Sequence, residues 1–301
     1  MMSSNSNIKN QNIPTRVYKK MSGLSEFAPM VFSICFVIII FSSAMASYAI
    51  NFMNKSMDSQ MEELRGIKQD DGMVVKLTDG GSTSDMGETA EASPAKMVED
   101  MAKLYEQNED VIGWLKIEGM NVDYPVMQTM EDEEYYLERD FEGNYNINGS
   151  LIMDTDSTVG TGTKAMDYAD GTKPSTNLII HGHNMKNGNM FGNLDKYRDI
   201  KFEKTHDMIT FSSLYETRKY QIVSVFLSQV YRANQTDVFK YYKFFQADNE
   251  EEFYDFYDNI KKKALYDTGV EAKYGDEFIT LSVCAYHVEN GRLVVVGKRV
   301  E

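Results

Sequence analysis

Cysteine and basic residues are scarce in this chain of 301 residues. The two cysteines exclude a fold held by several disulfides and a cysteine-rich zinc module. Only 31 Lys and Arg stand against 46 Asp and Glu, a formal net charge of −15. This deficit argues against a nucleic-acid partner, which requires a basic patch. Hydrophobic residues make up 42 % and charged residues 26 %, values typical of a globular protein with one or two domains.

Charge is absent altogether from residues 27–50, a run of 24 residues. As a helix it would extend about 36 Å, which exceeds the roughly 30 Å hydrocarbon core of a bilayer. Residues 1–26 contain four basic residues and one acidic residue, a net charge of +3. The excess of positive charge before the apolar run predicts a cytoplasmic N-terminus and export of residues 51–301.

A cleaved signal peptide is the alternative, because Ala44-Met45-Ala46 resembles a cleavage site. The apolar run is long for a signal peptide, which favours a retained anchor. We therefore expect a single-pass protein of the cell membrane with four parts. They are a cytoplasmic tail (1–26), a transmembrane anchor (27–50), an extracellular stalk or linker (51–95) and a catalytic domain (96–301).

The segment after the anchor changes character twice. Residues 55–65 are predicted to continue as a short polar helix, and residues 66–94 are rich in Gly, Ser, Thr and Asp, as in a flexible spacer. A helix is then predicted with Ser93 as its N-cap and Pro94 at its first position. Its apolar residues recur at helical spacing: Met97, Met101, Leu104 and Tyr105.

The rest of the chain favours strands. Short segments that alternate apolar with polar residues, mostly bounded by Gly, Asn or Asp, lie at 113–118, 121–127, 149–153, 177–182, 207–212, 218–227, 277–284 and 292–299. Eight such strands predict a mainly β fold, a closed or nearly closed barrel. One long helix is predicted at 249–265, with Asp248 as N-cap and one apolar face formed by Phe253, Phe256, Tyr257 and Ile260.

Cys284 is the only thiol in the exported part, since Cys35 falls inside the apolar run. A thiol reacts well only as a thiolate, so a catalytic cysteine needs a base or a cation nearby. His183 follows His181 and a glycine at the end of an apolar strand, where functional groups are commonly presented. His287, three residues after Cys284, is the other candidate base, and His206 lies in a charged, solvated stretch.

Spacing in the last twenty residues supplies a cation. A hairpin centred near Val288 pairs Cys284 with Arg292 across the ladder, about 5 Å apart at Cβ. The guanidinium could then bind a developing oxyanion, or alternatively point to solvent. Arg299 lies about 23 Å further along the same strand, so we expect its replacement by Lys to be nearly silent.

Three segments together resemble the class B sortases. They are 177–194 (NLIIHGHNMKNGNMFGNL), 280–284 (TLSVC) and 292–297 (RLVVVG). The resemblance continues upstream through 111–117 (VIGWLKI), 122–126 (VDYPV), 134–137 (EYYL) and 149–154 (GSLIMD), so it covers about residues 96–301. The long helix before the cysteine strand is also similar to the family.

The resemblance implies an eight-stranded sortase barrel and a transpeptidase. By position, Cys284 is the implied nucleophile, His183 the general acid/base and Arg292 the oxyanion or substrate-positioning group. Ser282 and Leu137 match positions that line the family's substrate groove, and no metal or organic cofactor is required. Two residues depart from the family pattern, and both affect the groove rather than a reacting group: Val283, usually Thr, and His181, often Tyr.

The implied reaction cleaves a C-terminal sorting signal of secreted surface proteins through a thioester. The acyl group then passes to an amine of the cell-wall peptide (a peptidoglycan precursor or cross-bridge) or, alternatively, to a pilin lysine. An L,D-transpeptidase is disfavoured because its Gly before the cysteine and Arg two residues after it are Val283 and Tyr286 here. A non-catalytic surface-binding module on a membrane anchor is the alternative from another class.

Overall fold

The computed structural model describes residues 15–69 and 93–301. The chain divides into two compact units, Met1–Phe52 and Met53–Glu301. Most of the expected spacer, residues 70–92, lies outside the described residues.

In the first unit, the described residues form part of one long helix, α1 (Thr15–Gln69). The large apolar side chains from Phe27 to Phe52 are exposed along it, Phe32 by 75 % of its surface. Among the described residues, α1 is the one helix long and apolar enough to cross a membrane. The length and the exposed apolar surface of this segment fit a membrane anchor or a signal sequence.

The last part of α1 belongs to the second unit. The prediction that residues 55–65 continue as a helix is confirmed, and the helix runs four residues beyond them, to Gln69. Met57, Met61 and Leu64 are buried in the main hydrophobic core. Arg65 donates from Nε and Nη2 to the carbonyl oxygen of Asp123 at 3.1 and 3.0 Å. This end of the helix is therefore amphipathic, with one face packed on the barrel.

The predicted start of the next helix is wrong. Helix α2 (Glu99–Gln107) begins five residues after Pro94, and Val98, in an extended conformation, precedes it. The amides of Ala95 and Val98 donate to the carbonyl oxygens of Asp170 and Leu214 at 2.9 and 2.8 Å. These bonds to other segments hold residues 93–98 out of the helix, which local capping signals cannot reveal.

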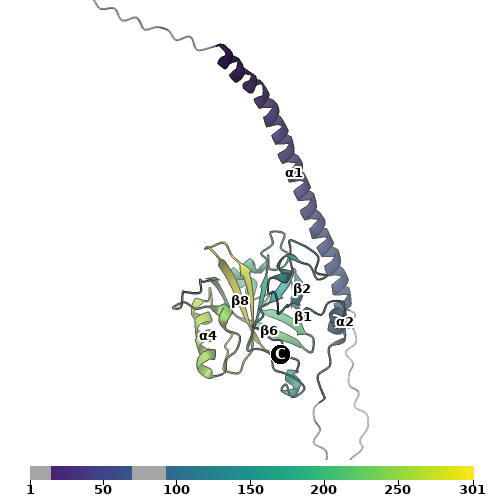
Figure 1. The fold of residues 1–301 in the computed structure, drawn as a ribbon. Helices are drawn as coiled ribbons and strands as arrows, with labels where there is room; N and C mark the ends of the chain where they lie inside the picture. Colours follow the sequence, from purple (N-terminus) through teal and green to yellow (C-terminus); the bar gives the residue numbers. More distant parts are fainter. Residues whose placement is uncertain (1–14, 70–92) are drawn as a thin grey trace, which may run out of the picture. The chain divides into compact units, whose positions relative to one another are not determined.

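Eight strands close into a barrel in the order β1-β2-β3-β4-β7-β8-β6-β5 (Figure 1). All eight predicted strands are present, each within two residues of the expected bounds: β1 (Val111–Ile117), β2 (Val122–Met127), β3 (Leu151–Met153), β4 (Asn177–Gly182), β5 (Met208–Ser213), β6 (Thr217–Gln229), β7 (Phe278–Cys284) and β8 (Gly291–Arg299). Between them lie a one-turn helix, α3 (Ile200–Glu203), and four 3₁₀ turns, η1 (Tyr135–Glu138), η2 (Lys164–Met166), η3 (Leu194–Arg198) and η4 (Tyr241–Lys243).

Alternation along the strands separates two faces. In β7, Ile279, Leu281 and Val283 point into the barrel core. Phe278, on the opposite face, joins a second cluster on the outside of the barrel. The intervening polar residues of β7 therefore lie on that outer face, where Thr280 donates to Asn177 Oδ1 at 2.8 Å.

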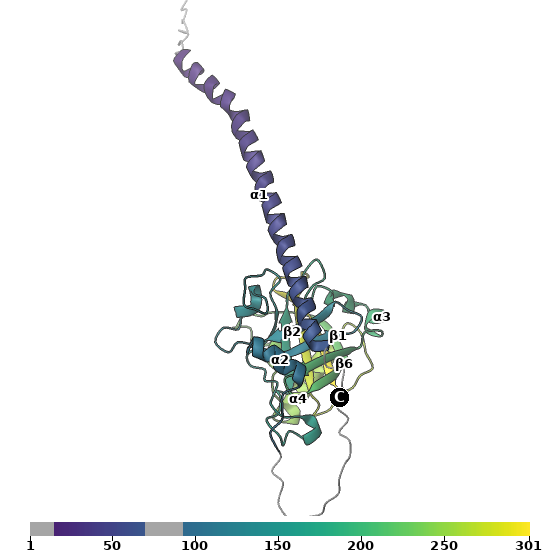
Figure 2. The ribbon, with the colours of Figure 1, turned by 90° about the vertical axis from the view of Figure 1, so that its right-hand side faces the viewer.

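Helix α4 (Glu250–Lys263) covers the second cluster with its four predicted apolar residues, all of them buried: Phe253, Phe256, Tyr257 and Ile260. The N-cap is Asn249, which accepts from the Glu252 amide at 3.0 Å, rather than the predicted Asp248. Figures 1 and 2 show α4 and α2 on opposite sides of the barrel. Because α4 lies on the outer face, it does not cover the ends of β4, β7 and β8, which loops surround instead.

The expectation that Arg299→Lys is nearly silent for acyl-enzyme formation stays a prediction, but the contacts of Arg299 give this residue a role in stability. The side chain of Arg299 is 2 % exposed and forms ion pairs with Glu216 and Glu277 at 2.9 and 2.8 Å. The same guanidinium donates to the hydroxyl of Tyr168 at 2.9 Å. Arg299 therefore links three segments of the chain. Its distance from Cys284 does not reveal this contribution to stability.

We predict that Arg299→Lys lowers the free energy of unfolding by about 2 kcal/mol, because one ammonium cannot replace three guanidinium contacts to buried partners. Chemical denaturation of the full chain in detergent measures this change. Lys298→Arg, the converse exchange at the neighbouring position, is the control and should have little effect. Equal stabilities of the two variants would contradict this account.

The loss of stability in Arg299→Lys should depend on pH. Burial alone would raise the pKa of Glu216. The hydrogen bonds from Arg299 and from the Lys164 amide, together with the charges of Arg218 and Arg299, outweigh burial and lower that pKa below its usual range. A carboxylate with a lowered pKa stabilises the fold above its unfolded pKa and loses that contribution as pH falls through the folded value. The difference between parent and Arg299→Lys should therefore narrow below about pH 4.

Candidate active site

Strand β7 brings the three predicted reacting groups to one end of the barrel. Its antiparallel pairing with β8 places Cys284 opposite Arg292, the register that hairpin spacing predicts. Its parallel pairing with β4 ends at Gly182 and Val283. One residue further, His183 follows β4 and Cys284 completes β7, so these two residues lie side by side.

His183 is held by a main-chain contact. Its Nε2 lies 2.7 Å from the carbonyl oxygen of Leu137, in η1. Because a carbonyl only accepts, Nε2 carries the hydrogen in this contact and the neutral ring presents an unprotonated Nδ1. Gly149 permits the approach with φ +60, since a Cβ there would lie 2.2 Å from the same carbonyl oxygen. This geometry leaves Nδ1 to exchange a proton with a reacting group.

Asn184 links the histidine loop to the cysteine strand. Its side-chain amide donates to the carbonyl oxygen of Cys284 at 2.8 Å. Sequence analysis missed this residue, although its position directly after His183 was a signal. The bond fixes the end of β7 relative to the loop that carries His183.

Arg292 turns toward the start of its own strand. Its Nη1 donates to the carbonyl oxygens of Gly291 and Asn290 at 3.0 and 3.4 Å. The side chain is half-buried, as is that of Cys284. An anchored guanidinium with further donors beside a thiol is suited to bind an oxyanion.

The two predicted groove residues differ in accessibility. Leu137 is 39 % exposed, whereas Ser282 is 2 % exposed and shares a hydrogen bond of 2.7 Å with the hydroxyl of Tyr241. Burial raises the pKa of Tyr241 to about 12, while Ser282 and the charge of Arg292 oppose the shift. Ser282 thus contacts Tyr241, a residue that sequence analysis missed, and Tyr241 lies within electrostatic reach of Arg292.

Two further histidines, His181 and His287, lie in other surroundings than His183. His287 is exposed in the turn between β7 and β8, as predicted. His181 faces Asp154, with Nε2 and Oδ2 3.5 Å apart. Within the described residues, His181, Asp154 and Glu133 form a cluster that could hold a metal ion.

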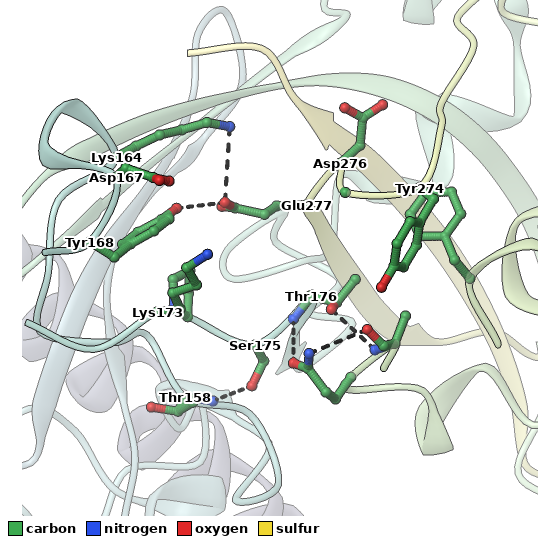
Figure 3. Close-up of a pocket in the computed structure, with 15 residues that line it drawn as sticks. Thr158, Lys164, Asp167, Tyr168, Lys173, Ser175, Thr176, Tyr274, Asp276 and Glu277 are labelled. Carbon is green, nitrogen blue, oxygen red and sulfur yellow. Dashed lines mark hydrogen bonds and ion pairs between the residues drawn. The ribbon is translucent and has the colours of Figure 1, made fainter. Parts of the chain in front are cut away.

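A cavity of about 410 Å³ lies elsewhere. Figure 3 shows Tyr168, Lys164 and Glu277 along its wall, and Thr176 on another side. Glu277 precedes β7, so this cavity is about 23 Å from Cys284 at 3.3 Å per residue. None of the predicted site residues lines it.

Comparison with known proteins shows the family of this chain. The sortase domain model matches residues 115–300. Sortase B of Listeria monocytogenes is 30 % identical over 233 residues, which cover 77 % of this chain and 83 % of that protein.

Solved structures give the same result. The sortase B of B. anthracis in complex with AAEK1 superposes with a TM-score of 0.63 and 25 % identity, over 84 % of this chain and 100 % of that one. A Staphylococcus aureus sortase B–substrate complex has a TM-score of 0.57 and 26 % identity, over 68 % and 87 %. The chain therefore belongs to the sortase family, in its class B, whose members are cysteine transpeptidases.

We predict that Asn184→Ala lowers the rate of transpeptidation about tenfold, because the loss of one partly buried hydrogen bond of 1–2 kcal/mol frees the end of β7. Asn187→Ala, an exposed asparagine of the same loop, is the matched control. Rates measured with a labelled sorting peptide should fall for the first variant alone. Unchanged activity in Asn184→Ala would show that the bond has no positioning role.

Proposed function

We propose that this enzyme joins secreted proteins to the cell wall through a thioester on Cys284. The observation that carries this proposal is the double pairing of β7, which sets Cys284 opposite Arg292 and beside His183. A nucleophile, an acid/base and a cation at one strand end are the groups that acyl transfer requires. The solved Staphylococcus aureus sortase B–substrate complex supports a sorting-signal substrate for this enzyme.

In the first half-reaction, Nδ1 of His183 takes the proton of the Cys284 thiol, and Sγ attacks the carbonyl carbon of a Thr or similar residue in a C-terminal sorting signal. The carbonyl oxygen becomes an oxyanion, which Arg292 stabilises by donating hydrogen bonds. The C–N bond then breaks as His183 protonates the departing amine from Nδ1. The products are a thioester on Cys284 and the released C-terminal peptide.

In the second half-reaction, an amine of a peptidoglycan precursor or cross-bridge attacks the thioester carbon. His183 takes a proton from this amine, a new amide bond forms and Cys284 leaves as thiolate. Leu137 and Ser282 line the peptide groove in this account, Leu137 by direct contact and Ser282 by holding Tyr241.

The location follows from the first 50 residues. We propose that residues 27–50 are a retained anchor, with a cytoplasmic N-terminus and an extracellular barrel, because residues 1–26 carry a net charge of +3. External protease on intact cells should remove the barrel. A mature protein beginning at Ser47 in the culture medium would show a cleaved signal peptide instead.

We predict that His183→Ala lowers transpeptidation about 10²–10⁴-fold, the usual contribution of a general acid/base. His287→Ala should retain most activity, since this histidine is exposed in the β7–β8 turn. Both rates are measured with a peptide selected from a library by its cleavage products. Loss of activity in His287→Ala alone would place the acid/base in that turn.

We predict that Arg292→Lys keeps the charge but lowers acyl-enzyme formation about 10²–10³-fold, as expected for the loss of an oxyanion donor. Arg299 cannot serve as the control because it is buried in an ion-pair network. The exposed Arg198 can, since it pairs only with Asp195 of its own turn in the described structure. Equal rates for Arg292→Lys and Arg198→Lys would exclude the oxyanion role.

A further inference from the structure

Three potential metal ligands meet beside the β4 end of the site. They are Glu133, which precedes η1, Asp154, which follows β3, and His181 in β4. One ligand atom from each lies within 4.8 Å of the other two. An imidazole nitrogen and two carboxylate oxygens form a donor set suited to Zn²⁺.

Asp154 is fixed before any ion binds. It is 9 % exposed, its amide donates to the carbonyl oxygen of Ile179 at 2.9 Å, and its own carbonyl oxygen accepts from Gln128 Nε2 at 2.8 Å. Its Oδ1 accepts from the Asp156 amide at 3.1 Å. Oδ2 is left facing His181.

The separation of Asp154 Oδ2 and His181 Nε2 fits two ligands of one metal ion better than a hydrogen bond. At 3.5 Å it is long for a hydrogen bond between these groups. Two ligands of a tetrahedral ion with bonds of about 2.1 Å are roughly 3.4 Å apart. The two atoms therefore already have the spacing of a shared coordination sphere.

Glu133 provides the third ligand and has no competing partner. Within the described part of the chain its carboxylate makes no hydrogen bond or ion pair. Lys243 Nζ lies 3.9 Å from Asp156 Oδ2, so this cation pairs with a carboxylate outside the cluster.

We propose that Glu133, Asp154 and His181 bind one divalent transition-metal ion, for which Zn²⁺ is the best fit, with a fourth position open to water. Binding would tie residues 133–137 to β3 and β4. Leu137, four residues after Glu133, holds His183 through its carbonyl oxygen. The ion thus orders one wall of the site and takes no part in acyl transfer.

Calorimetry with ZnCl₂ on the full chain in detergent tests the site directly. Cys284→Ala is the background for all samples, because it removes a competing thiolate without reference to activity. We expect one ion per chain, and an affinity at least about tenfold weaker in Glu133→Gln and in His181→Gln. Glu131→Gln, an exposed acid two residues away, is the matched control and should bind as the background does.

Absence of a one-to-one site, or equal affinities of Glu133→Gln and Glu131→Gln, would overturn the proposal. Hydrogen exchange provides a second measurement. Zn²⁺ should slow exchange of the amides at 133–137 in the background protein and leave Glu133→Gln unaffected. Zinc binding does not require acyl transfer, so failure of the zinc experiments and failure of the proposed function can be told apart. Only the inferred effect of the ion on the position of His183 rests on the proposed function.

Discussion

The pairing of β7 with two different neighbours is the constraint on which the site depends. The strand runs parallel to β4 and antiparallel to β8. The parallel pairing brings a thiol and an imidazole to the same strand end, and the antiparallel pairing returns a guanidinium to that end after a short turn. Since a shift of one residue would turn every β7 side chain to the other face, the apolar inward residues that fix the register also aim Cys284 outward.

Support for this arrangement comes mainly from the main chain. His183 is bonded to the Leu137 carbonyl, Asn184 to that of Cys284, and Arg292 to that of Gly291. Each of these bonds holds a side chain in place before a substrate binds, which would lower the entropic cost of the proposed reaction. The buried pair of Ser282 and Tyr241 closes the outer face beneath them.

Local patterns predicted the strands, the apolar face of α4 and the pairing of Cys284 with Arg292, because each depends on residues close in sequence. Features that depend on partners distant in the sequence could not be predicted. Glu216 and Glu277 bury Arg299, bonds to Asp170 and Leu214 delay the start of α2, and the β4–β7 pairing gives Asn184 its partner. The prediction of Asp248 as the N-cap of α4 was wrong for a local reason. Asp and Asn are equally good N-caps, and it is the adjacent Asn249 that forms the capping bond.

Trapping of an acyl-enzyme tests the central claim most directly. The full chain is incubated with a sorting peptide in the absence of an acceptor amine, and its intact mass is then measured. We predict that the mass increases by that of the acyl fragment, that peptide mapping locates the adduct on Cys284, and that hydroxylamine removes it. An adduct on another residue, or equal cleavage of the peptide by Cys284→Ala, would contradict the account.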